Sequence, residues 1–378
     1  MPDSLLRNIW IAPAILAALT ALSAFGQVYK YTGPIGALPY TAGVAVACYL
    51  ACRHLETLAR FKRVWPSLMI AIALFIIAAF LVLYPIAQSG QWGGGTDRDE
   101  ALNIALDAVS AGQYPYYLRT YLNNDLSPAP GALLLAAPAW LLGNAAWQNI
   151  PWIALFFLFL WRSFAPTLAV LLAVAIACNA GVMQDIVTGG DYVINAIYVA
   201  LAVAAVMATA RDAPLLHCAA LIFLGIAICS RPIYAVAPVA LAALFWRHLG
   251  PRAALRVLAV AGAVALALGL PIYLHDPAAF TPLHQPTSYV TIPIPHASTA
   301  LGLAALTIAL MASRIPFDLF ALYGTIALAL SVMFIPVAIH WMLIGKYLSF
   351  AHATAPLTLF GALWAAKWIE RQHGTATR

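Results

Sequence analysis

The chain has 378 residues, of which 64% are hydrophobic and only 8% are charged. A composition this apolar excludes a soluble globular enzyme and is typical of a multi-spanning α-helical membrane protein. The formal charge of +6 does not indicate a nucleic-acid partner, because the basic residues lie next to apolar stretches, where the positive-inside rule accounts for them.

Residues 1–60 contain two apolar stretches, at 8–28 and 35–52, which we interpret as an N-terminal transmembrane hairpin. The first stretch follows Arg7 and imitates a signal peptide, with Leu22-Ser23-Ala24 in place of a cleavage site. Because this stretch reaches the length of a membrane-spanning helix, we expect it to be an uncleaved first span.

A polar segment at residues 88–146 interrupts the apolar stretches and holds five of the 13 acidic residues of the chain. Apolar residues recur at helical spacing between 99 and 111, which predicts a short amphipathic helix. Thr96 is its expected N-cap and Gly112 its expected stop signal. The acids either only cap this surface helix or carry chemistry. Chemistry is favoured, because aromatic and hydrogen-bonding residues follow at once: Tyr114, Tyr116, Tyr117, Asn123 and Asn124.

The apolar piece from Gly131 to Leu142 is too short to cross a membrane and contains Pro138, so we expect a re-entrant or interfacial helix. The sequence therefore predicts an all-α polytopic bundle of about twelve spans, with an outer loop at 88–146 that carries juxtamembrane helices. Besides the two hairpin spans, the predicted spans are 66–86, 147–161, 165–181, 192–210, 214–230, 232–246, 255–274, 297–312, 316–337 and 348–366, all within a main module at 61–378.

The distribution of charge supports this arrangement. With both ends of the chain on the cytoplasmic side, fourteen of the 19 basic residues fall inside and five outside, which is the asymmetry that sets membrane orientation. Eight of the 13 acidic residues fall outside. We therefore expect the polar segment to face away from the cytoplasm.

Charged residues from later parts of the chain are expected at the same outer face. Arg231 lies between two short spans, where a guanidinium group needs an anion or an acidic partner. Its partner is either an aspartate, Asp185 or Asp191, or a phosphate group, which suits the guanidinium fork. Lys346 either snorkels to the membrane interface or binds phosphate as well.

The remaining metal and nucleophile candidates give little signal. His340 stands out among the nine histidines because Lys346 and Tyr347 follow it at the same surface. No HxxxH or HExxH pattern occurs, and Asp97 and Asp99 give only the sequence DRD, so a divalent cation is weakly indicated and no metal ligands are assigned. All five cysteines lie in apolar stretches without CxxC or Cys/His spacing, which indicates neither disulfides nor zinc.

Several motifs follow one another in a characteristic order. They are the acids Asp97 and Asp99-Glu100, the helix ending at Gly112, Tyr114-Pro115-Tyr116, Ser127-Pro128-Ala129-Pro130-Gly131, Ser230-Arg231-Pro232 and Lys346-Tyr347. This order resembles the GT-C superfamily of multi-spanning glycosyltransferases, and most of all its bacterial polyprenyl-phosphate-mannose-type branch, over residues 66–366. Two features depart from the pattern: an added hairpin precedes the acidic loop, and Lys346 stands where an arginine is common.

The resemblance implies inverting transfer of a mannose-like hexose from a polyprenyl-phosphate donor to a hydroxyl of a lipid, glycan or protein, on the outer side of a bacterial cytoplasmic membrane. Its general base would be Asp97, fifteen residues before Gly112, with Asp99 and Glu100 as close rivals. No cofactor is expected. The implied substrate-binding residues are Tyr114, Tyr116 and Tyr117 for stacking on a sugar, Asn124, Asp185 and Asp191 for hydroxyl groups, and Arg231, His340, Lys346 and Tyr347 for the phosphate.

Two other functions compete with this one. A transporter or lipid flippase would also have many spans and a cationic inner face, but it predicts internal repeats with broken spans in matching halves. We find no repeat between the halves, and the acids gather in one asymmetric loop. A non-catalytic assembly subunit would tolerate the loss of every outer acid.

Overall fold

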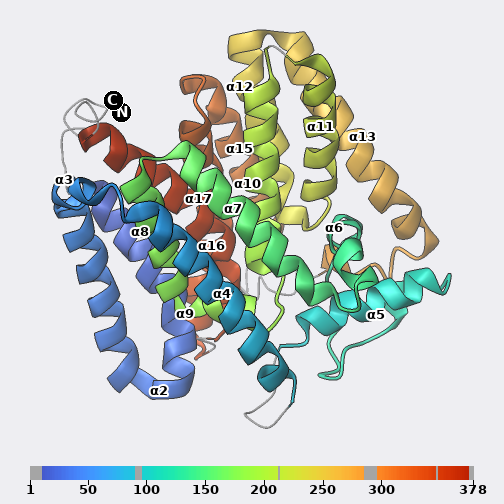
Figure 1. Ribbon diagram of the computed structural model, residues 1–378. Coiled ribbons are helices and arrows are strands. Elements are labelled where there is room, and N and C mark those ends of the chain that lie inside the picture. Colours follow the sequence, from blue (N-terminus) through green and yellow to red (C-terminus); the bar gives the residue numbers. More distant parts are fainter. Residues whose placement is uncertain (1–10, 90–95, 212, 285–295, 346–347, 374–378) are drawn as a thin grey trace.

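The computed structural model describes residues 11–89, 96–211, 213–284, 296–345 and 348–373, and its regular structure in these ranges is helical (Figure 1). Seven helices are long and apolar enough to cross a membrane, or eight if one bent pair counts as a single span. The all-helical fold is therefore confirmed for the described residues, and the long apolar helices fit a multi-pass membrane protein, whereas the count of about twelve spans is not confirmed. Several expected spans are too short, since α7 (Asn149–Ser163) and α11 (Pro214–Ile228) have 15 residues each and a full crossing takes about 20.

The other elements follow in chain order. The α-helices are α2 (Ile11–Arg53), α3 (Leu55–Leu58), α4 (Trp65–Gln88), α5 (Arg98–Ser110), α6 (Pro130–Leu141), α8 (Pro166–Cys178), α9 (Ala180–Val187), α10 (Tyr192–Thr209), α12 (Val236–Leu249), α13 (Pro251–His275), α15 (Ala297–Leu310), α16 (Leu319–Leu343) and α17 (Leu348–His373). Short 3-10 turns are η1 (Ala59–Phe61), η2 (Pro115–Tyr117), η3 (Ala145–Gln148), η4 (Pro232–Ala235) and η5 (Met311–Arg314).

The first helix, α2, folds back on itself at the bottom of the view in Figure 1 and has a kink at Gly33, where φ is +61°. A positive φ is readily available only to glycine. Helix α2 packs along α17 and against α9. The side chain of Asn179 ties it to the bundle by donating hydrogen bonds to the Thr20 carbonyl (2.9 Å) and to Ser23 Oγ (2.7 Å).

The span expected at 165–181 is broken in the structure, because two helices occupy this stretch and together form the bent pair. Helices α8 and α9 meet at Asn179 with a bend of 71°. The Asn179 side chain accepts a hydrogen bond from the Val182 N–H (3.0 Å) and so caps the start of α9. A side-chain acceptor at this position replaces the carbonyl of the preceding turn, which allows a new helix direction.

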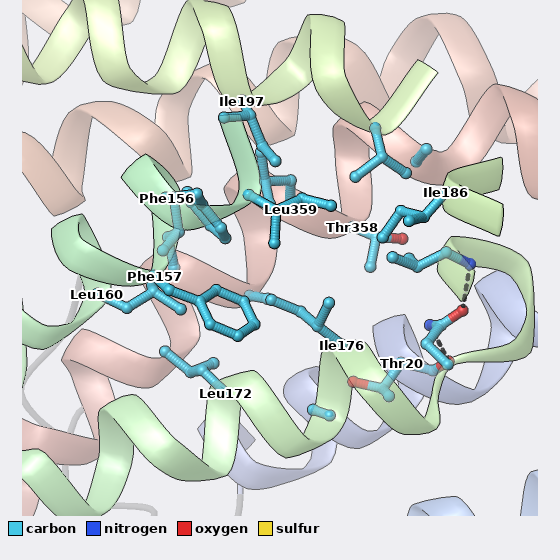
Figure 2. A pocket seen from close by; sticks show the side chains of 18 of the residues that line it. Thr20, Phe156, Phe157, Leu160, Leu172, Ile176, Ile186, Ile197, Thr358 and Leu359 are labelled. Carbon is cyan, nitrogen blue, oxygen red and sulfur yellow. Dashed lines mark hydrogen bonds between the residues drawn. The ribbon is translucent and has the colours of Figure 1, made fainter. Parts of the chain in front are cut away.

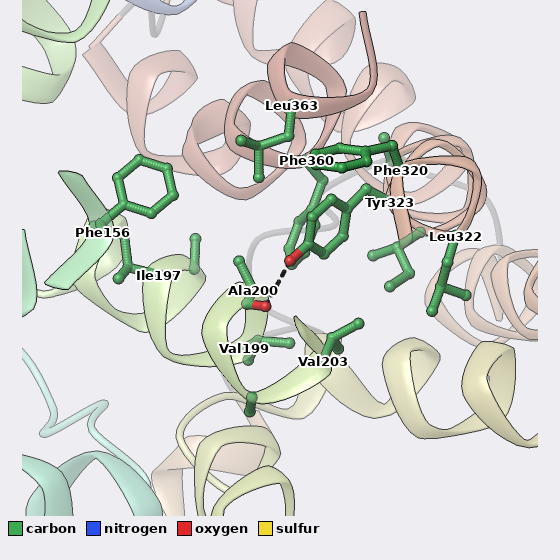
Figure 3. Close-up of a cluster of buried hydrophobic side chains, with 14 of the residues drawn as sticks. Phe156, Ile197, Val199, Ala200, Val203, Phe320, Leu322, Tyr323, Phe360 and Leu363 are labelled. Atoms are coloured by element: carbon green, nitrogen blue, oxygen red, sulfur yellow. Dashed lines mark hydrogen bonds between the residues drawn. The ribbon is translucent and has the colours of Figure 1, made fainter. Parts of the chain in front are cut away.

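The main core lies where α7, α8, α10, α12, α16 and α17 pack together. In Figure 3 the ring of Tyr323 lies beside Phe360, with its hydroxyl directed at α10. This hydroxyl donates a hydrogen bond of 2.7 Å to the Ala200 carbonyl, and Tyr323 is fully buried. A buried phenol needs such a partner, because an unpaired hydroxyl in an apolar interior costs about 1–3 kcal/mol.

Residues 96–146, here called the loop module, have a small core of their own. It joins one face of α5, Tyr116, Leu126 and α6 to Phe280 beyond α13. The expected amphipathic helix is present as α5, and Gly112 follows it with a φ of +70°. The expected cap is wrong, because Asp97 rather than Thr96 is the N-cap residue, and its side chain makes no cap hydrogen bond.

Candidate functional site

A cavity of about 880 Å³ lies between the loop module and the helix bundle. Its polar lining residues come mainly from the start of α5, from the segment 116–127, from Tyr192 and from Arg231. Its lining residues on α15 and α16 are mostly apolar, namely Leu301, Met333, Phe334, Val337 and Trp341. The cavity therefore offers a polar and an apolar surface to one ligand.

Asp97 is the expected general base that lines this cavity. Its Oδ2 accepts hydrogen bonds from Thr120 Oγ1 (2.5 Å) and Asn124 Nδ2 (2.8 Å). Within the described residues its Oδ1 accepts none. One oxygen is thus held in place while the other is available to a ligand, and Thr120 was not foreseen from the sequence.

Asp99 and Glu100, the two rival acids, point elsewhere. Asp99 is buried, and its Oδ2 accepts hydrogen bonds from the Tyr84 hydroxyl (2.6 Å) and from Gln88 Nε2 (2.9 Å). Burial raises the pKa of the Asp99 carboxyl, and the hydrogen bond from Tyr84 partly opposes this shift. Glu100 accepts a hydrogen bond from the backbone N–H of Tyr121 (3.1 Å). Neither acid lines the cavity.

The three tyrosines expected to stack on a sugar occupy different surroundings. Tyr116 is 4% exposed, packs edge-on against Phe280, and donates a hydrogen bond to the Pro128 carbonyl (2.9 Å). Tyr114 stacks on His275, and partial burial raises its pKa to about 12. Tyr117 is 60% exposed and lines the cavity. Tyr116 also lines the cavity wall, but only Tyr117 presents an open ring there.

The segment after α13 is fastened to these tyrosines. Tyr114 and Tyr117 donate hydrogen bonds to the carbonyl (3.2 Å) and to Oδ2 (3.1 Å) of Asp276. The Ala279 N–H lowers the pKa of the Asp276 carboxyl by a hydrogen bond, and Tyr117 adds to this effect. These hydrogen bonds position the segment 278–284, whose residues form part of the cavity wall.

Three arginines line the cavity: Arg98, Arg119 and Arg231. Arg119 pairs with the exposed Asp125 (3.1 Å), whereas Arg98 and Arg231 are each paired with a more deeply buried aspartate. Arg98 Nη1 donates to Asp185 Oδ1 (2.6 Å), and Arg231 Nη2 donates to both carboxylate oxygens of Asp191 (2.9 and 2.8 Å). Both guanidinium carbons lie over the ring of Tyr192, at 3.7 and 4.8 Å from its centre. Of the alternatives expected for Arg231, the structure contains the ion pair with Asp191.

Asp185 and Asp191, expected to bind hydroxyl groups, do not line the cavity. Asp185 also accepts a hydrogen bond from the Val193 N–H (2.9 Å), and Asp191 accepts one from Asn195 Nδ2 (2.9 Å). His340 lies partly buried on α16 outside the cavity lining. Lys346 and Tyr347 lie outside the described residues.

Arg98 and Tyr192 were not predicted from the sequence as site residues. A signal for both was present, because Arg98 lies between two candidate acids and Tyr192 directly follows Asp191. Their convergence depends on the turn between α9 and α10, where Gly189 has a φ of +75°. Such a tertiary contact has no local pattern.

No group of three metal-ligating side chains occurs within the part of the chain that the structure describes. A second cavity, of about 60 Å³, lies where α2, α7, α8, α9, α10 and α17 meet. In Figure 2 its walls are Phe156, Phe157, Leu160 and other apolar side chains. None of its lining residues is titratable, so the larger cavity is the candidate site.

Comparisons of the chain with known protein families, with curated proteins and with solved structures find no match.

Proposed function

We propose that this protein is an inverting glycosyltransferase that moves a mannose-like hexose from a polyprenyl-phosphate donor to a hydroxyl acceptor. One observation carries the proposal: Asp97, with a carboxylate oxygen free of hydrogen bonds from the described residues, lines the same large cavity as Arg231 and an apolar wall on α15 and α16. A sugar linked through phosphate to an isoprenoid chain has matching parts, namely a hydroxylated ring, an anion and an apolar tail.

The chemistry follows from these positions. A hydroxyl group is a poor nucleophile, so Asp97 Oδ1 takes the acceptor proton while the acceptor oxygen attacks the anomeric carbon. The bond from this carbon to the phosphate oxygen breaks, and the electron pair leaves with the polyprenyl phosphate. Attack opposite the leaving group inverts the configuration. Arg231 stabilises the charge that develops on the phosphate, and Tyr117 offers its exposed ring to a sugar.

The proposal includes the orientation of the protein in the membrane and the number of its crossings. We place the cavity on the outer side of a bacterial cytoplasmic membrane, with about twelve crossings once short helices such as α7 and α11 are included. The excess of basic residues at the opposite end of the bundle supports this orientation. His340, Lys346 and Tyr347 remain candidate phosphate ligands by sequence resemblance, and no cofactor is assigned.

A transporter or lipid flippase is the second candidate, and the break between α8 and α9 favours it. Discontinuous spans are common at transporter binding sites. A transporter built from inverted repeats predicts a matching break in each half, whereas the described residues contain a single bent pair. The cluster of acids in one loop also has no counterpart in the second half of the sequence.

Purified protein in lipid nanodiscs tests the proposal. It would be incubated with a radiolabelled polyprenyl-phosphate hexose and with lipid, glycan and peptide acceptors. We expect Asp97→Asn to reduce transfer by about 10²–10⁴-fold, because a general base contributes on this order. We expect Asp99→Asn and Glu100→Gln to keep transfer within about tenfold of wild type, since neither side chain lines the cavity.

Asp107→Asn is the matched control, because Asp107 lies on the same helix, is exposed and bonds to Trp140 outside the cavity. It should leave transfer unchanged. Full transfer by Asp97→Asn would refute its role as base. Passage of lipid or solute across a proteoliposome membrane, without any sugar transfer by the wild type, would favour the transporter instead.

A further inference from the structure

We propose that Arg98 and Arg231 together bind the phosphate group of the lipid-linked donor, with Tyr192 between them and with Asp185 and Asp191 as counter-ions on the side away from the cavity. This inference rests on the proposed function, because it takes the donor to be a polyprenyl phosphate. It adds a second cation, and it assigns the two aspartates to support of the arginines rather than to binding of sugar hydroxyls.

The order of burial supports this arrangement. The side chains of Asp185 and Asp191 are 4% and 1% exposed, and those of Arg98 and Arg231 are 12% and 10% exposed. Both arginines line the cavity and neither aspartate does. Each guanidinium group therefore lies between a buried carboxylate and the cavity, which fixes its position before any ligand binds.

The two guanidinium groups lie around one aromatic ring, that of Tyr192. Each has its central carbon within 5 Å of the centre of the Tyr192 ring. A phosphate group presents several oxygens that accept hydrogen bonds from guanidinium forks. Because Arg98, Tyr192 and Arg231 line the same cavity, we assign the phosphate group to the part of the cavity beside Tyr192.

Arg98 has donors left for such a ligand. Within the described residues, it donates from Nη1 alone, to Asp185. Its Nη2 and Nε groups remain for an anion in the cavity, because arginine carries five N–H donors and no acceptor. If the Arg98–Asp185 ion pair only stabilised the fold, its stability would not depend on Arg98 lining the cavity.

A second cation would also assist the proposed reaction. The donor is a phosphodiester with one negative charge, and the leaving group is a phosphomonoester with a second charge. As Asp97 takes the acceptor proton, negative charge moves from the carboxylate to the phosphate. Fixed cations beside that phosphate stabilise the transition state most, because the charge increases there.

The test compares binding of two probes that differ only in the anion: polyprenyl phosphate and the neutral polyprenol of equal length. The informative variant is the double change Arg98→Gln/Asp185→Asn, which removes both members of the ion pair and leaves no buried charge unpaired. We expect it to bind polyprenyl phosphate about 10- to 100-fold more weakly, the range that one charge-assisted hydrogen bond supplies. Its affinity for polyprenol should not change.

The matched control is Arg371→Gln/Asp318→Asn, because this pair makes a comparable contact of 2.6 Å at another place in the bundle. It should bind both probes as the wild type does. Arg98→Lys should bind polyprenyl phosphate with intermediate affinity, since lysine keeps the charge but not the fork. Unchanged affinity for polyprenyl phosphate in the double variant, or equal loss for both probes, would overturn the inference.

The source of the anion is tested separately with vesicles of phosphatidylglycerol. Binding of this phospholipid with the same dependence on Arg98 would assign the site to bulk lipid and refute the donor assignment. Failure of this inference differs from failure of the proposed function. Sugar transfer by the wild type with an unaffected Arg98 variant would refute only the inference, and Arg98-dependent binding without transfer would refute only the function.

Discussion

At the scale of single residues, the two acids Asp97 and Asp99 have separate roles although only Arg98 lies between them. Side chains two positions apart at a helix start point in different directions. Asp97 therefore lines the cavity, while Asp99 accepts hydrogen bonds from Tyr84 and Gln88 on α4. The sequence singled out the acidic cluster, but it could not predict which acid lines the cavity, because that depends on what packs around each carboxylate.

The raised pKa of Asp99 gives a prediction about stability and pH. The folded protein binds this proton more tightly than the unfolded chain, because burial disfavours the charged carboxylate. Ionised Asp99 therefore costs stability above its folded pKa, and this cost disappears as the pH falls below the unfolded value of 3.8. Asp99→Asn removes the charge and keeps an oxygen that accepts from Tyr84, so it should unfold at an equal or higher temperature than wild type at pH 8.

This advantage should narrow as the pH is lowered toward 3.8, because the raised pKa lets the folded wild-type protein protonate Asp99 before the unfolded chain does. Thermal unfolding of both proteins in the same detergent at pH 5, 6.5 and 8 measures the difference. A variant that is less stable than wild type by the same amount at every pH would show that the ionised carboxylate is a net stabiliser. In that case the free energy gained from the hydrogen bonds of the Asp99 carboxylate exceeds the cost of burying its charge.

At the scale of elements, helical periodicity predicted α5, and a short apolar run predicted a helix at the place of α6. The apolar residues of α5 recur on one face, and a glycine with positive φ ends it. The break between α8 and α9 was missed, since the stretch from 167 to 178 is almost entirely apolar and no proline lies at the bend. Asn179 was the available signal, because asparagine within an apolar run is a favoured N-cap.

The turn between α9 and α10 holds the two arginine–aspartate pairs in register, and Gly189 is its critical position. Its φ is +75°, and an added Cβ would lie 2.8 Å from both Ala146 Cβ and Tyr84 Cε2. Gly189→Ala should therefore destabilise the protein by the cost of a left-handed conformation, roughly 1–2 kcal/mol, plus an overpacking cost of about 1–3 kcal/mol.

Gly112→Ala separates these two effects. Its φ of +70° is similar, but nothing lies within 4 Å of an added Cβ, so only the conformational cost applies. Chemical or thermal unfolding of both variants should rank Gly189→Ala as the less stable. Equal destabilisation would mean that the packing around Gly189 relaxes without cost.

At the scale of the whole molecule, composition predicted the class and the charge bias predicted an orientation. What composition could not predict is how the hairpin and the loop module join the bundle. Residues that are distant in sequence form these contacts, such as Asn179 with Thr20 on α2 and Phe280 with Tyr116 in the loop module. Contacts of this kind are decided by packing between elements, on which local patterns carry no information.

The proposed orientation predicts which residues face the outside of the cell. In Figure 1 α5 and the connection between α12 and α13 lie toward opposite ends of the bundle, and Ser110 and Arg252 are exposed at these two places. In a background without the five native cysteines, Ser110→Cys should react with a membrane-impermeant maleimide on intact cells. Arg252→Cys should react only after the membrane is permeabilised, because its side has the excess of basic residues.

Asn123→Cys, exposed in the loop module, should behave as Ser110→Cys does. Since both positions belong to one packed module, different results for the two would indicate a local distortion rather than a topology. Labelling of both only after permeabilisation would place Asp97 and its cavity on the cytoplasmic side. Sugar transfer on the outer face of the membrane would then be excluded, because a donor bound at the outer face could not reach Asp97.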